Sequence, residues 1–167
     1  MKLFHLSDNP GIVRFEPRPS AYTAEPVVWA ISDQRIANYL LPRDCPRVCF
    51  RAGAESSDED VARLLGSESA VIAIEEAWLE PLRVAKLYRY LMPSDGFVLQ
   101  DEGAGYWVSH GATEPLAMEV LDDLPDAIAV EGVTLKVLPS LWDLHDAVKA
   151  SSLKFSMIRM RNAGARR

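Results

Sequence analysis

Short apolar segments recur along the whole chain, and their length constrains the fold more than any other feature. Each segment is as long as a β-strand and is rich in β-branched or aromatic residues. They are KLFHL (2–6), PVVWAIS (26–32), RVCF (47–50), AVIAIE (70–75), KLYRYLM (86–92), GFVLQ (96–100), YWVS (106–109), PLAMEVL (115–121), VTLKVL (133–138) and FSMIRM (155–160). This pattern predicts about ten strands.

Four short helices are predicted between these strands, three of them at Ser cap signals and three of them before a Gly or Pro stop. They are expected over residues 32–41, 57–66 and 124–131 and from residue 140 onward, with Ser32, Ser57 and Ser140 as caps. Because strands and helices do not alternate regularly, we expect an α+β fold with two curved or split, mostly antiparallel sheets. The chain has no repeat and no linker, so a single domain, 1–167, is expected.

Composition limits the expected cellular location of the protein and the kinds of partner that it binds. The chain has no leader-like start and no apolar run near the roughly 20 residues of a membrane span, so a cytoplasmic protein without a membrane partner is expected. A net charge of −6 disfavours a general nucleic-acid binder. Cys45 and Cys49 have no second Cys or His pair to complete a zinc site. We therefore expect reduced structural thiols and no metal.

Three longer stretches carry a resemblance to a known fold family: LFHLSDNPGIVRFEPRP, VVWAISDQRIANYLL and GAGYWVSHGATEPLAMEVL. They resemble the first strand and loop, the second strand and helix, and the late strand of ADP-ribosyltransferase-like domains. The patterns LYRY, GAGYWVS, LPSLW and FSMIRMRNA are similar, along nearly the full length, to a family of small uncharacterised bacterial proteins. The first resemblance implies an ADP-ribosyltransferase-like fold that binds NAD; the second implies no function.

The transferase resemblance implies roles for individual residues. It matches His5 to the histidine that bonds a ribose hydroxyl of NAD, and Trp29 to the aromatic residue that stacks on nicotinamide. The position of the usual catalytic glutamate is Gly105, and the nearest acid, Glu102, comes three residues earlier. On an extended strand that is a shift of about 10 Å, so Glu102 reaches the site only if residues 103–105 form a turn.

Two further groups of polar residues have both a functional and a structural interpretation. His110 either pairs with His5 as an acid/base couple across adjacent strands or is an exposed turn residue. Arg159 and Arg161 alternate on one face of the last predicted strand, where their guanidinium groups suit either a phosphate or a structural ion pair. The predicted cofactor-binding residues are His5, Ser7, Arg18, Trp29, Tyr39, Arg43, Tyr106, Ser109, Arg159 and Arg161.

The sequence thus predicts an ADP-ribosyltransferase-like domain that binds NAD or a related phosphorylated nucleotide. As an enzyme it would transfer ADP-ribose or a phosphate-linked group to an RNA end or a protein, with His5, Glu102 and His110 as catalytic candidates. The RNA 2′-phosphotransferase branch, which grips phosphates with arginine and histidine, suits a chain with Gly105 at the glutamate position. The alternative is a non-catalytic ligand- or protein-binding module on the same scaffold.

Overall fold

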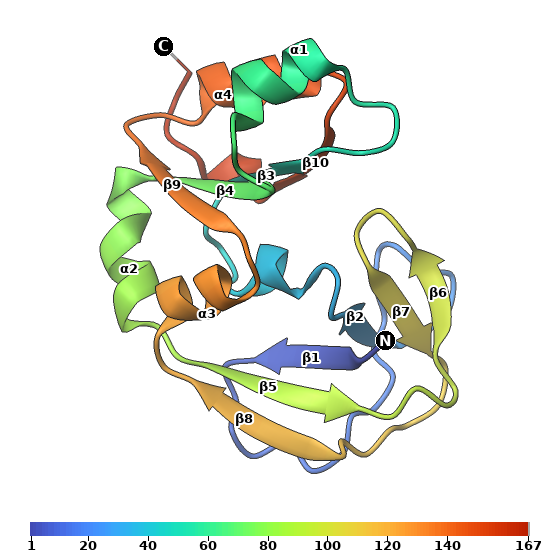
Figure 1. Ribbon diagram of the computed structural model, residues 1–167. Helices are drawn as coiled ribbons and strands as arrows, with labels where there is room; N and C mark the ends of the chain where they lie inside the picture. The colour runs from blue at the N-terminus through green and yellow to red at the C-terminus, as the bar shows by residue number, and fades with distance from the viewer. Residues whose placement is uncertain (167) are drawn as a thin grey trace. The chain divides into compact units, whose positions relative to one another are not determined.

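The computed structural model describes residues 1–166 and divides into two compact units (Figure 1). Unit 1 comprises Met1–Leu40 and Lys86–Asp122, and unit 2 comprises Leu41–Ala85 and Asp123–Arg167. Each unit is built around one sheet, and over the described residues the protein is α+β with two mostly antiparallel sheets and four short helices. The predicted fold class is confirmed at this level, and the single domain stays a prediction.

Unit 1 contains a fully antiparallel six-stranded sheet in the order β6-β7-β2-β1-β5-β8. Its elements are β1 (Leu3–Ser7), β2 (Val28–Ser32), the 3₁₀ turn η1 (Ile36–Tyr39), β5 (Leu87–Met92), β6 (Val98–Asp101), β7 (Tyr106–Ser109) and β8 (Ala117–Leu121). These six strands match six of the predicted segments to within a few residues. The predicted helix over residues 32–41 is wrong. Ser32 is the buried last residue of β2, its N–H donates to Gly105 O at 2.9 Å, and only the short turn η1 follows.

The register of this sheet sorts its side chains onto two faces. Leu3 pairs with Ser32 and Phe4 with Ile31, and directly paired residues in antiparallel strands share a face. We call the face that carries Leu3 and His5 the His5 face, and the opposite face the Trp29 face. The His5 face packs into a core of Leu3, Phe15, Val28, Ala30, Tyr90, Met92 and Phe97.

The loop over residues 9–26 is ordered, and its residue Phe15 belongs to this core. Phe15, 8% exposed, joins Thr113 through two backbone hydrogen bonds, and Arg18 joins Val27 in the same way. The hydroxyl of Tyr90 donates to Asn9 O and accepts from the N–H of Ile12. These bonds hold the loop on the sheet without further strands.

Unit 2 contains a four-stranded sheet in the order β10-β3-β4-β9, in which only the β4–β9 pair is parallel within the described residues. Its strands are β3 (Arg47–Arg51), β4 (Ala70–Glu75), β9 (Thr134–Leu138) and β10 (Lys154–Ile158). Its helical segments are α1 (Asp58–Asp60) with η2 (Val61–Leu65), η3 (Glu76–Trp78) with α2 (Leu79–Val84), α3 (Leu124–Val130), α4 (Trp142–Lys149) and η4 (Met160–Asn162).

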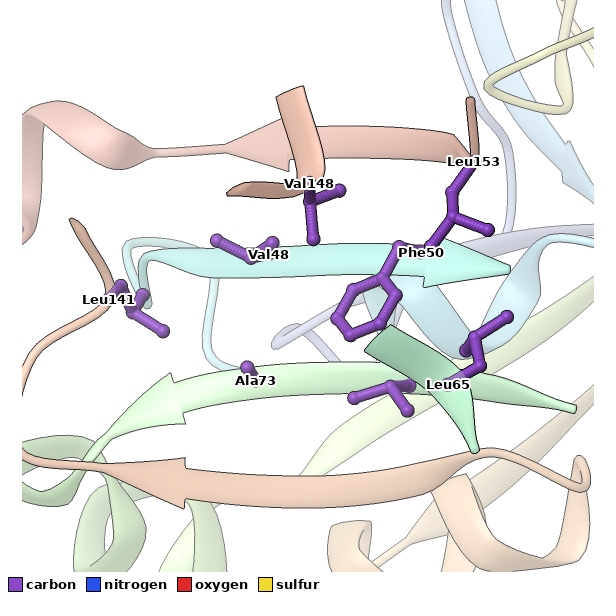
Figure 2. Packing of buried hydrophobic residues seen from close by; sticks show 8 residues of the cluster. Val48, Phe50, Leu65, Ala73, Leu141, Val148 and Leu153 are labelled. Carbon is purple, nitrogen blue, oxygen red and sulfur yellow. The ribbon is translucent and has the colours of Figure 1, made fainter. Parts of the chain in front are cut away.

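Figure 2 shows the core of unit 2, where Val48, Phe50 and Ala73 of the sheet meet side chains from its helical segments and loops. The predicted cap at Ser57 is confirmed, since its hydroxyl accepts the N–H of Asp60 at 3.2 Å. The last strand ends earlier than predicted. Arg159 has a left-handed φ of 55°, which breaks the extended conformation after Ile158.

Candidate functional site

Three half-buried aromatic side chains gather on the Trp29 face of unit 1, and we call them the aromatic cluster. Trp29 comes from β2, Tyr106 from β7 and Tyr39 from η1. The ring centroids of Trp29 and Tyr106 lie 5.2 Å apart in an edge-to-face arrangement, and those of Tyr39 and Tyr106 lie 5.5 Å apart. In an edge-to-face pair, at least one face of each ring is left uncovered by the other ring. Nucleobases and similar planar groups stack on such faces.

The turn between β6 and β7 fixes the position of Tyr106. It starts at Glu102, whose carbonyl accepts the N–H of Gly105 at 3.3 Å, and the hydroxyl of Tyr39 donates to Ala104 O at 3.1 Å. Residues 103–105 therefore form the turn that a role for Glu102 requires. The Glu102 side chain is exposed on this turn, and its catalytic role stays a prediction.

Position 105 has no room for a side chain. Gly105 has a φ of 75°, and a Cβ added to it would lie 2.6 Å from Cβ of Arg35 and 3.0 Å from Oγ of Ser32. A glutamate at this position would meet both a steric clash and an unfavourable backbone conformation. The turn therefore requires glycine at position 105.

Arg35 is a candidate that the sequence did not single out. Its Nη1 donates to Gln34 O at 3.0 Å, and its aliphatic part lies against Gly105. Its Nε is buried and has no hydrogen-bond partner among the described residues. A buried guanidinium nitrogen without a partner is unfavourable unless an anion or another acceptor reaches it. In the sequence, only its position four residues before Tyr39 connects Arg35 with the aromatic cluster.

His5 lies on the opposite face from the aromatic cluster. Its Nδ1 lies 2.8 Å from Trp29 O, and its ring packs on Phe15 with centroids 4.5 Å apart. Because a carbonyl only accepts hydrogen bonds, Nδ1 carries the proton. The sheet register therefore contradicts a common pocket wall formed by the side chains of His5 and Trp29. His5 has the bonded and packed surroundings of a core histidine.

The other predicted residues of unit 1 do not join the aromatic cluster. Ser7 and Ser109 are buried on the His5 face, where their hydroxyls bond nearby backbone groups. Arg18 is an exposed loop residue. His110 is exposed and lies 3.6 Å from a carboxylate oxygen of Glu25. The predicted couple of His5 and His110 across adjacent strands is wrong in its geometry, because β2 lies between β1 and β7.

The three predicted arginines of unit 2 lie in three different settings. Arg43 is exposed, and its carbonyl accepts from Nη2 of the buried Arg47 at 3.2 Å. Arg159 is half-buried at the end of β10, and Arg161 is exposed in η4. The expectation that Arg159 and Arg161 alternate on a strand is therefore wrong, because the strand has ended before both.

The cysteines of unit 2 are buried free thiols. Burial raises the pKa of Cys45 to about 11 and that of Cys49 to about 12, so both are protonated and unreactive at neutral pH. Among residues 1–166, no three His, Cys, Asp or Glu side chains are grouped to hold a metal ion. The helices formed by these residues all fall short of the length and hydropathy of a membrane span.

The fold and the aromatic cluster together define a two-sheet α+β protein with a candidate site for a planar ligand on unit 1. The model of a family of unknown function, DUF6886, matches residues 4–163, and the chain belongs to this family. This agrees with the predicted membership of a family without known function. Searches of curated proteins and of solved structures returned no significant match.

Proposed function

We propose that unit 1 binds NAD or a related phosphorylated nucleotide, with a planar ring of the ligand stacked on the aromatic cluster. The observation that carries this proposal is the meeting of Trp29, Tyr39 and Tyr106, from three separate elements, on one face of the sheet. Aromatic faces combined with a few polar groups are the usual composition of a small-ligand site. The ADP-ribosyltransferase-like resemblance supplies the class of ligand.

In this proposal, the guanidinium group of Arg35 binds the phosphate of the ligand. Its side chain lies against Gly105, the residue before Tyr106, and its buried Nε has no hydrogen-bond partner among the described residues. A guanidinium group binds phosphate oxygens through paired N–H donors. In this proposal Arg35 takes the phosphate-binding role that the sequence had assigned to Arg18, Arg43, Arg159 and Arg161.

Binding without transfer is favoured by the geometry at position 105. The turn excludes a side chain at position 105, and an ADP-ribosyltransferase-like reaction then needs another carboxylate. Glu102 is the candidate for that carboxylate, and an RNA end or a protein would be the acceptor. The alternative function, a non-catalytic binding module, needs no such group and rests on the same observation.

Calorimetry and tryptophan fluorescence with NAD, ADP-ribose and a 2′-phosphorylated oligonucleotide test the binding proposal. We expect at least one of them to bind, and Trp29→Ala to weaken its affinity by about 5- to 150-fold, since a base-stacking contact contributes about 1–3 kcal/mol. Tyr22→Ala is the matched control, because Tyr22 is an aromatic residue of the same unit that is 84% exposed. If none of the three ligands binds at millimolar concentration, the proposal fails.

A second measurement separates transfer from binding. Mass spectrometry detects release of nicotinamide from NAD by the wild-type protein and by Glu102→Gln. If Glu102 is catalytic, the variant loses release and keeps its NAD affinity, because only the reacting group has changed. If the protein is a binding module, NAD stays intact with both proteins.

A further inference from the structure

The chain segment after β10 contains an arginine, Arg166, that side chains of unit 2 contact from two sides. Cζ of Arg166 lies 4.1 Å from the centre of the Trp142 ring. Its Nη1 and Nη2 donate to the two carboxylate oxygens of Asp146 at 2.8 and 3.1 Å. A bidentate pair combined with an aromatic face recognises the flat guanidinium group and discriminates against an ammonium group.

Two residues earlier, both backbone polar groups of Gly164 are hydrogen-bonded to side chains of unit 2. Its N–H donates to both carboxylate oxygens of Glu75, at 2.9 and 3.2 Å, and its carbonyl accepts from Nε1 of Trp142 at 2.6 Å. Glu75 is only 7% exposed. A Cβ at position 164 would lie 3.2 Å from Oε2 of Glu75, a tight contact that requires the carboxylate to shift by a few tenths of an ångström. The contacts thus select a backbone N–H and C=O with little space for a side chain at position 164 and, two residues later, an arginine.

The groups that make these contacts belong to regular elements. Glu75 is the last residue of β4, and Trp142 and Asp146 lie one turn apart on α4. Nδ1 of His145 lies 2.8 Å from Oδ1 of Asp146, and the His145 ring lies edge-on to Trp142 at 5.1 Å. We call Glu75, Trp142 and Asp146 the receptor residues. Strand β4 and helix α4 hold them in position, not the segment 164–166 that binds to them.

The segment itself buries little. Gly164, Ala165 and Arg166 are all exposed, and polar contacts to the buried Glu75 and the exposed Asp146 hold them in place. The buried carboxylate of Glu75 needs a hydrogen-bond donor, and the carboxylate of Asp146 is paired with a guanidinium group. Another chain segment that offers a peptide N–H and a guanidinium group satisfies the same two carboxylates in its place.

We propose that Glu75, Trp142 and Asp146 form a recognition site for a Gly-x-Arg segment of a partner protein. The chain's own residues 164–166 occupy this site and compete with the partner. The match of two carboxylates and an aromatic face to one peptide group and one guanidinium group is the basis for this chemistry. The site lies wholly within unit 2 and is independent of the nucleotide proposal for unit 1.

The test uses the full chain with Arg166→Ala and a peptide Asn-Ala-Gly-Ala-Arg, which has the sequence of residues 162–166. Calorimetry measures affinity, and the indole N–H signal of Trp142 in NMR spectra, assigned with Trp142→Phe, reports the site. We expect Arg166→Ala to bind the peptide at least about tenfold more tightly than wild type, because a tethered competitor acts at roughly millimolar effective concentration. Peptides with Lys for Arg, or Ala for Gly, are expected to bind more weakly.

Arg161→Ala is the matched control, since Arg161 is an exposed arginine of the same segment with no contact to the receptor residues among those described here. It should bind the peptide as weakly as wild type, and Asp146→Asn added to Arg166→Ala should abolish binding. If Arg166→Ala fails to fold by circular dichroism, Arg166→Lys replaces it and should give an intermediate affinity. Absence of peptide binding to the folded variant at millimolar concentration overturns the proposal. So does a wild-type dimer that Arg166→Ala abolishes, because the occupant would then be a second copy.

Discussion

Each unit contains a cluster built around a tryptophan, and the two clusters are held by different forces. In unit 1, Trp29 meets two tyrosines, and the cluster depends on a tight glycine turn and a tyrosine–carbonyl hydrogen bond. In unit 2, Trp142 meets His145 and Arg166, and charged hydrogen bonds join both of these residues to Asp146. One cluster contains only rings, while the other has an arginine of the same chain on its tryptophan.

This difference indicates how each cluster can serve a ligand. The ring cluster has no charge of its own, so it suits the planar part of a ligand whose charge is bound elsewhere. The ionic cluster is specific for a cation and already contains one. Steric fit should therefore dominate the response of unit 1 to substitution, while charge should dominate the response of unit 2.

The largest effect is expected from Gly105→Ala, which tests whether the turn supports the ring cluster. The new Cβ would lie 2.6 Å from Cβ of Arg35 in a left-handed conformation. We expect the free energy of unfolding to fall by about 2–4 kcal/mol, measured by urea denaturation. Gly111→Ala is the control, because a Cβ there meets nothing within 4 Å. Equal stability of the two variants would show that the turn is not tightly packed.

His5→Ala should have the next largest effect, and it should act on stability. The change leaves Trp29 O without its 2.8 Å partner and removes the ring that packs on Phe15. An unsatisfied buried group costs about 1–3 kcal/mol, so we expect a loss of this size in thermal unfolding. His110→Ala, at an exposed position, is the control. If His5→Ala instead loses nucleotide affinity and keeps its stability, His5 binds the ligand and is not a core histidine.

Strand positions were predictable because each strand has its own apolar signal. All ten predicted segments overlap strands of the structure, because β-branched and aromatic residues gather in short stretches between turn residues, even in β6, whose residues are all exposed. The predicted strand over residues 155–160 extends two residues beyond the end of β10 at Ile158. Nothing in its apolar pattern marks the left-handed conformation of Arg159.

The candidate site was predictable only in part, because it depends on register. The aromatic residues Trp29, Tyr39 and Tyr106 were all proposed, and they do meet. Their separation from His5 follows from the pairing of Phe4 with Ile31, and a shift of one residue in this pairing would reverse it. Contacts between distant segments, such as Trp142 with Arg166, likewise have no local signal.

Tyr39→Phe tests the hydrogen bond that holds the ring cluster, and its effect should be smaller. The variant keeps the ring and loses the hydroxyl that donates to Ala104 O at 3.1 Å. We expect a loss of about 1 kcal/mol in the free energy of unfolding by urea. Tyr22→Phe, at an exposed tyrosine of the same unit, should leave stability unchanged. A larger loss would mean that polar contacts, and not sterics, dominate unit 1.

The smallest effect, and the one that marks unit 2 as charge-dependent, is expected from Asp146→Asn. Hydrogen bonds from Arg166 and then His145 lower the pKa of Asp146 below its ordinary value. Because the folded pKa is the lower one, the carboxylate stabilises the fold fully above the unfolded value of about 3.9. This contribution is lost as the pH falls from there through the folded pKa. Urea unfolding is measured at neutral pH and at acid pH values below the folded pKa of Asp146. At neutral pH, wild type should be slightly more stable than Asp146→Asn. This difference in stability should shrink in acid and in high salt. Asp95→Asn, a change of equal charge at an exposed loop residue of unit 1, controls for net charge. If the difference between wild type and Asp146→Asn is the same at every pH, packing holds the cluster of unit 2 just as it holds that of unit 1.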